Sequence, residues 1–87
     1  MSPITTQVAS LATTQKLCDA NAQRKVLIIE NTDTNRLHVL LNSGSATTTA
    51  YSFSLAQNAN MKIERYTGEV NGIWAADGSG SAIITQY

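Results

Sequence analysis

The chain has 87 residues, 43% apolar and 14% charged, and its six basic and six acidic residues give a net charge of zero. This length suits one small domain, and the charge balance argues against a nucleic-acid binder or a polybasic membrane anchor. A single cysteine excludes an intramolecular disulfide, and because we find neither a signal peptide nor a transmembrane-length segment, we expect synthesis in a cytoplasm.

Residues 1–14 are predicted to form an N-terminal arm. They contain the only proline, and three isolated apolar residues, Ile4, Val8 and Leu11, lie among Thr, Ser, Gln and Ala. This weak pattern predicts a segment that is extended or disordered in the free protein and adds little to the fold. We expect Ile4, Val8 and Leu11 to contact a partner surface.

The most apolar stretch, residues 26–29, predicts a central strand over residues 24–30. It lies between the basic pair Arg24 and Lys25 and a polar turn at residues 31–35. Its β-branched content favours an extended chain, and since both faces are apolar we expect both to be covered. A short strand at residues 14–18 precedes it.

Four further segments are predicted as strands because apolar and polar residues alternate along them or because turn-forming residues bound them. They are residues 51–55, 61–64, 69–74 and 81–87. Before them, residues 37–41 place Leu37, Val39 and Leu41 on one face and are expected to form a hairpin with the central strand. The last strand is expected at a sheet edge, open to another subunit.

Seven short strands predict an all-β fold, a small antiparallel β-sandwich or barrel over residues 15–87, with the extended N-terminal arm before it. We predict a core that includes Val26, Ile28, Val39, Phe53, Ile63, Trp74 and Ile84.

No catalytic or metal-binding constellation is predicted, and no cofactor. His38 is the only histidine, lacks a second ligand nearby, and is interpreted as a surface or interface residue. A Ser-His-Asp set composed of His38, Asp77 and a serine would be chance. Cys18 has no neighbouring base and is expected to fill space in a strand. The carboxylates Glu30, Asp33, Glu64 and Glu69 do not predict a glycosidase pair.

Two motifs have both a structural and a functional interpretation. Asp77-Gly78-Ser79-Gly80 predicts a hairpin turn whose glycines supply positive φ, since no helix or lysine follows to make a phosphate loop. Trp74 with the nearby aromatic residues would suit a sugar-stacking platform, but core or interface packing is favoured because Trp74 ends an alternating strand.

Two stretches together resemble small β-sandwich structural proteins of tailed bacteriophages. The first, residues 22–32, reads AQRKVLIIENT, and the second, residues 66–85, reads YTGEVNGIWAADGSGSAIIT. In the family a comparable N-R-K and L-I-I-Q-N strand precedes Y-T-G-x-I-x-G-I-W. Here Gln23 replaces the family's Asn, Glu30 replaces Gln, and Gln86-Tyr87 replaces an acidic ending. The resemblance covers about residues 14–87 and leaves the arm unmatched.

The resemblance implies a non-enzymatic virion protein, specifically a decoration or cement protein that binds the major capsid protein on the outer face of the head. Low charge, small size and a last strand at a sheet edge predict self-association, and the resemblance favours a trimer. The alternatives left open are a tail or head-fibre attachment component of the virion and a small carbohydrate-binding module.

Overall fold

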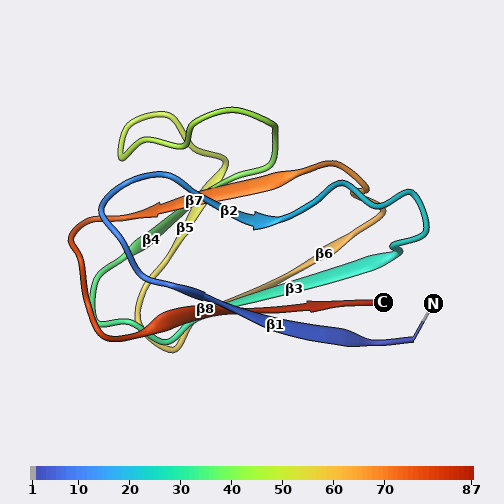
Figure 1. Cartoon of the computed structure of the whole chain (residues 1–87), viewed down its shortest axis with the longest axis horizontal. Coiled ribbons are helices and arrows are strands. Elements are labelled where there is room, and N and C mark those ends of the chain that lie inside the picture. The colour runs from blue at the N-terminus through green and yellow to red at the C-terminus, as the bar shows by residue number, and fades with distance from the viewer. Residues whose placement is uncertain (1) are drawn as a thin grey trace.

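The computed structural model describes residues 2–87, which form eight strands in two packed four-stranded sheets (Figure 1). One sheet has the order β1-β8-β3-β6 and the other β2-β7-β4-β5. The strands are β1 (Ile4–Ala9), β2 (Gln15–Cys18), β3 (Val26–Asn31), β4 (Leu37–Leu40), β5 (Phe53–Leu55), β6 (Asn60–Glu64), β7 (Val70–Trp74) and β8 (Ser81–Gln86). The predicted antiparallel β-sandwich is therefore confirmed. No helix among these residues is long and apolar enough to cross a membrane.

The N-terminal segment is extended, as expected, but it is a strand of the sandwich rather than a separate arm. β1 pairs antiparallel with β8 along its whole length, from Ile4 opposite Gln86 to Ala9 opposite Ser81. Five of its six residues are exposed, with Val8 half-buried. An exposed edge strand carries little hydrophobic pattern, which explains why the sequence does not distinguish it from a mobile arm. The predicted boundary at residue 14 is corrected accordingly.

β3 is an interior strand, as predicted, but only one of its faces is covered. It pairs with β6 on one side and β8 on the other. Leu27 and Ile29 are fully buried between the sheets, whereas Val26 and Ile28 point to the outer face and are half-buried. Their assignment to the core was wrong, because a continuous apolar run hides the alternation that separates the two faces.

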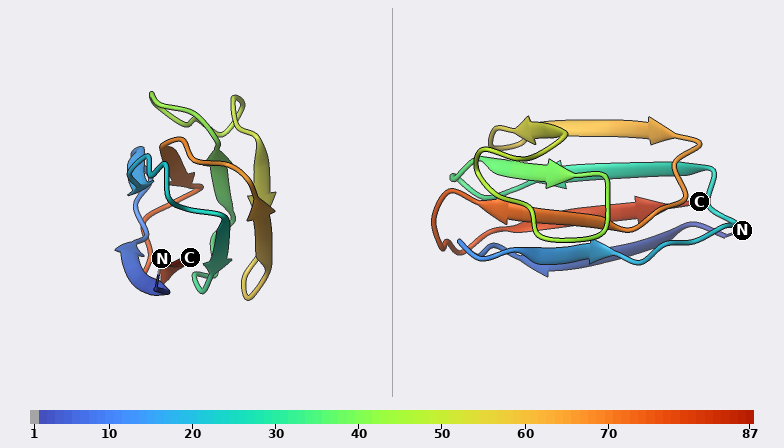
Figure 2. Two further views of the ribbon diagram at one scale, coloured as in Figure 1. Left: turned by 90° about the vertical axis from the view of Figure 1, so that its right-hand side faces the viewer. Right: turned by 90° about the horizontal axis from the view of Figure 1, so that it is seen from above.

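Two predicted neighbour relations were also wrong. β4 pairs with β5 and β7 and so lies in the sheet opposite β3, since the chain crosses between the sheets after residue 31. β8 lies between β1 and β3 and is no edge. The edges are β1 and β2 on one side of the sandwich and β6 and β5 on the other (Figure 2).

The core lies between the two sheets and contains most of the predicted residues. Val39, Trp74 and Ile84 are fully buried, and Phe53 and Ile63 pack against the core from its margins. The predicted inward face of β4 is confirmed, with Leu37 and Val39 buried and Leu41 packed beside them. Complete burial of Trp74 excludes it as an exposed sugar-stacking surface.

Candidate functional site

The first of two buried polar centres surrounds Arg24, which lies two residues before β3 and is only 2% exposed. Its guanidinium Nε donates a hydrogen bond to the Tyr66 carbonyl (3.1 Å), and Nη2 donates to the Gly68 carbonyl (2.6 Å). Nη1 donates to the Asp19 carbonyl (3.1 Å) and to Oε1 of Gln86 (2.9 Å). We call these five residues the arginine clamp. They join the chain before β3 to the segment before β7 and to the end of β8.

Tyr66 and Gly68 fit this clamp closely. The Arg24 guanidinium carbon lies 5.9 Å from the centre of the Tyr66 ring, and the Tyr66 hydroxyl donates to the Glu69 carbonyl (2.7 Å). A Cβ atom on Gly68 would lie 2.7 Å from Cζ of Tyr66, so a larger residue would displace the ring. The buried charge is satisfied by carbonyl and amide oxygens, an arrangement that fixes the loops to which these oxygens belong.

The second polar centre lies at the other end of β3. Asn31 is fully buried, and its Nδ2 donates to the carbonyls of Asn35 (2.9 Å) and Leu55 (3.0 Å). Its Oδ1 accepts hydrogen bonds from the indole Nε1 of Trp74 (3.0 Å) and the backbone N–H of Asp33 (3.0 Å). Asn31 thus bridges the two sheets and satisfies the one polar group of the buried tryptophan.

Asp33 extends this second centre, and we call Asn31, Asp33, Trp74, Ser10 and Gly80 the aspartate cap. The buried carboxylate accepts hydrogen bonds from the Ser10 hydroxyl, the Asn35 backbone N–H (2.8 Å) and the Gly80 backbone N–H (3.1 Å). The bond from the Asn35 backbone, and then the bond from Ser10, hold the pKa of Asp33 below its usual value. The cap ties the end of β1 to the turns that follow β3 and β7.

The glycines of the predicted turn at residues 77–80 have a different purpose from the one expected. Among the described glycines only Gly44 has a positive φ. A Cβ atom on Gly78 would collide with the Asp33 carboxylate, and one on Gly80 would lie 2.5 Å from Cα of Asp33. The turn therefore needs glycine so that its backbone can approach Asp33, and not for positive φ.

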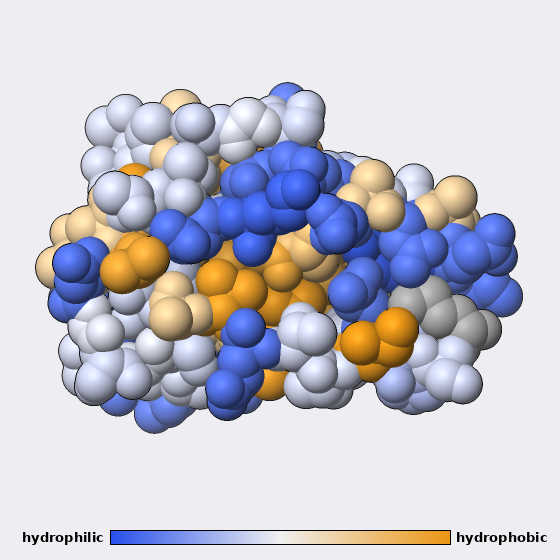
Figure 3. Space-filling view, viewed as in Figure 1, coloured by the Kyte–Doolittle hydropathy of each residue, from blue (hydrophilic) through white to orange (hydrophobic). Residues whose placement is uncertain are grey.

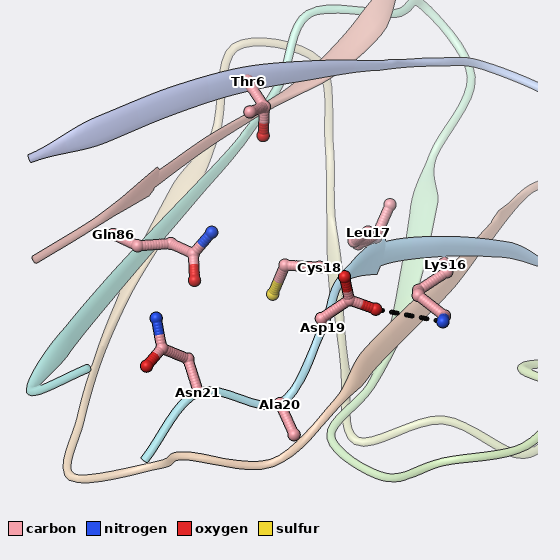
Figure 4. Close-up of a pocket in the computed structure, with 8 residues that line it drawn as sticks. All are labelled: Thr6, Lys16, Leu17, Cys18, Asp19, Ala20, Asn21 and Gln86. Atoms are coloured by element: carbon pink, nitrogen blue, oxygen red, sulfur yellow. Dashed lines mark hydrogen bonds and ion pairs between the residues drawn. The ribbon is translucent and has the colours of Figure 1, made fainter. Parts of the chain in front are cut away.

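Two open depressions border the arginine clamp. One, of about 520 Å³, is lined by residues that include Arg24, Lys25 and Arg65, and the other, of about 380 Å³, is shown in Figure 4. Cys18 contributes its sulfur, 3.5 Å from Nη1 of Arg24, and Lys16 forms a surface ion pair with Asp19 (3.0 Å) at the rim. Burial raises the pKa of the Cys18 thiol, and the Arg24 charge offsets this only in part. A protonated thiol is a weak nucleophile, so Cys18 does not provide this depression with an activated nucleophile.

His38 and Asp77, the remaining candidates for a catalytic set, have separate surroundings. His38 is buried rather than at the surface, and its ring packs edge-on against Tyr51 with a centroid distance of 4.7 Å. Its Nδ1 has no hydrogen-bond partner within residues 2–87. Asp77 instead accepts a hydrogen bond from the Ala12 N–H (2.7 Å). In the described part of the chain, no cluster of three His, Cys, Asp or Glu residues is placed to hold a metal ion.

The three predicted partner-contact residues differ in exposure. Ile4 is 49% exposed and Leu11 38% exposed, whereas Val8 packs against the core. Ile4 and Leu11 remain available to a partner, and their contact role stays a prediction. The buried roles of Arg24, Asn31 and Asp33 were not predicted, although the first two lie in the stretches that carry the phage resemblance.

Comparison with known proteins identifies a shared fold. No protein-family model matches the sequence, and no curated protein matches it significantly. A solved structure described as "Bacillus endospore appendages form a novel family of disulfide-linked pili" is similar, with a TM-score of 0.59 and 18% sequence identity. The alignment covers 99% of this chain and 84% of that chain. At this identity the similarity concerns the fold of a small β protein.

Proposed function

We propose that this chain is a non-enzymatic structural subunit used in many copies, specifically a decoration protein that binds the major capsid protein on the outside of a tailed-phage head. One observation carries the proposal: the two stretches that resemble phage structural proteins meet in space. The arginine clamp joins Arg24 of the first to Tyr66 and Gly68 of the second, and Asn31 of the first accepts the Trp74 indole N–H of the second. The resemblance therefore concerns one connected framework instead of two separate coincidences.

The surface is compatible with use in an assembly. The six basic and six acidic residues balance, and Lys16 and Lys62 form exposed ion pairs with neighbouring carboxylates. Such a surface has no strong field of one sign that would repel identical neighbours packed side by side. Many weak contacts of this kind would hold a coat through avidity.

The pilus protein with the same fold favours a second candidate, a subunit of a fibre or tail appendage. That protein is described as disulfide-linked. In this sequence Cys18 is the only cysteine and is 8% exposed, and one thiol joins at most two copies. A continuous disulfide-linked filament is thus disfavoured, and a non-covalent coat is the better fit.

Reconstitution tests the proposal. Purified protein is added to heads that lack their own copy, to tails, and to complete particles, and co-sedimentation is measured with the heat-induced release of DNA. We expect saturable binding to heads and DNA release at a higher temperature. Binding to tails alone would favour the fibre or tail candidate, and binding to neither would contradict both.

A further inference from the structure

The four edge strands of the sandwich differ in how well they are protected from pairing with another strand. β2 has an irregular register between Lys16 and Cys18, β5 has only three residues, and β6 carries Lys62 and Glu64. Short length, irregularity and charge all discourage strand addition. β1 has none of these features: its six residues, Ile-Thr-Thr-Gln-Val-Ala, are uncharged and pair with β8 in unbroken register.

The open side of β1 presents backbone groups in a known order. The Ser10 N–H donates to the Gly80 carbonyl (3.1 Å), and in the β1–β8 register Ser10 continues the row of even-numbered residues that face β8. Because backbone groups alternate along an antiparallel strand, the N–H and C=O groups of Thr5, Gln7 and Ala9 point to the open edge. Figure 3 looks onto this side of the molecule, where apolar surface shows between hydrophilic side chains.

We propose that β1 pairs antiparallel with β1 of a second copy, about a twofold axis at Thr6. In this register Thr5 of one copy lies opposite Gln7 of the other, and the two residues exchange backbone hydrogen bonds. This pairing uses the odd-numbered residues, whose N–H and C=O groups point to the open edge. Ile4, 49% exposed, comes opposite the half-buried Val8 of the second copy, so the exposed parts of these two apolar side chains cover each other. The two sheets then join into one continuous sheet across the axis.

Neighbouring features support this register over the next one. If the axis lay at Gln7, the odd-numbered residues would still form the hydrogen bonds, but Ile4 would lie opposite Ser10, whose hydroxyl already donates a hydrogen bond to Asp33. With the axis at Thr6, Pro3 lies opposite Ala9, and its missing N–H ends the ladder there. A twofold pair also replaces the trimer that the phage resemblance implies. This inference depends on the β1 edge alone and stands or falls independently of head binding.

Cysteine trapping tests both the interface and its register. Thr6 is exposed and lies on the axis, so in Thr6→Cys the two Cα atoms would be about 4.5 Å apart, within disulfide reach. In Gln7→Cys the two positions are displaced by two residues along the strands and lie out of reach. Under mild oxidation we expect a cross-linked dimer from Thr6→Cys, little from Gln7→Cys, and none from wild type, whose Cys18 is buried. Cross-linking through position 7 but not 6 would overturn the register.

A second measurement does not depend on oxidation. Sedimentation equilibrium of the wild type over about a hundredfold range of concentration should reveal a species of twice the 9.3 kDa chain mass. Gln7→Pro removes an N–H that faces the open edge and should weaken association by about tenfold or more, whereas Gln7→Thr keeps it. The melting temperatures at high dilution should agree. A wild type that stays monomeric, or a Gln7→Pro variant that associates normally, would overturn the proposal.

Discussion

At the scale of single residues, the arginine clamp makes a prediction about stability. Arg24→Met should reduce the free energy of unfolding by about 2–4 kcal/mol, because it leaves several buried oxygen acceptors without a donor. Arg24→Lys should recover only part of this loss, since a compact ammonium cannot reach all the oxygens spread around the edge of the planar guanidinium. Urea denaturation monitored by Trp74 fluorescence measures the difference.

Lys25→Met is the matched control, since Lys25 is the exposed neighbour and its change should be within about 0.5 kcal/mol. Equal effects of the two substitutions would show that the clamp contributes nothing. The sequence indicates only a basic pair before a strand. It does not tell which member is buried, because the partners of Arg24 include backbone carbonyls 42 and 44 residues away.

The ionisation of Asp33 should make the free energy of unfolding depend on pH. Its folded-state pKa lies below the unfolded value of about 3.9, so its contribution is complete above that pH and is lost as the pH falls through the folded-state pKa. Asp33→Asn should be less stable than wild type at pH 6, and the gap should narrow at pH 2–3. Urea midpoints across this range measure it.

Glu64→Gln provides the comparison, since Glu64 forms only an exposed ion pair with Lys62 (3.6 Å). Its curve should run parallel to that of the wild type. A constant gap between Asp33→Asn and wild type down to pH 2 would contradict the assignment of Asp33 as an ionised, hydrogen-bonded group.

At the scale of elements, the faces of β3 are tested by a pair of adjacent substitutions. Ile29→Asp should prevent folding, because it places a charge in a fully buried position. Ile28→Asp should fold with a much smaller loss of stability, since Ile28 points to the half-exposed outer face. Circular dichroism and thermal melting distinguish them, and equal damage from both would mean that the outer face is covered.

β1 yields a second prediction for an element. Deleting residues 2–10 should lower the melting temperature by roughly 10 °C or more, since it uncovers β8 and removes Ser10 from the aspartate cap. Deleting residues 2–3 alone, which lie outside β1, should have little effect. An unchanged melting temperature for the longer deletion would restore the arm that the sequence suggests.

β3 and β1 also show which parts of the fold the sequence patterns do not predict. The alternating strands around Leu37 and Phe53 are located correctly, because apolar residues recur at every second position along both segments. β3 hides its faces in a continuous apolar run, and β1 is exposed on both sides, so neither leaves that pattern. Strand order was not predicted either, since it depends on where the chain crosses between sheets.

At the scale of the whole molecule, the protein is a flattened body of 33 × 22 × 16 Å with its polar centres at opposite ends of β3. Buried polar centres that hydrogen-bond loops from both sheets favour a rigid unit, because breaking one leaves unsatisfied groups. A rigid, nearly neutral unit is well suited to repeated use on a larger surface, where each copy contributes a modest contact energy.

Copy number in purified particles tests this account most directly. The protein is quantified by mass spectrometry against the major capsid protein, with isotope-labelled peptides of both as standards. A coat of the head predicts copies on the order of hundreds per particle, in a fixed ratio to the capsid protein. About a dozen copies or fewer, or none, would contradict a role as a head decoration protein.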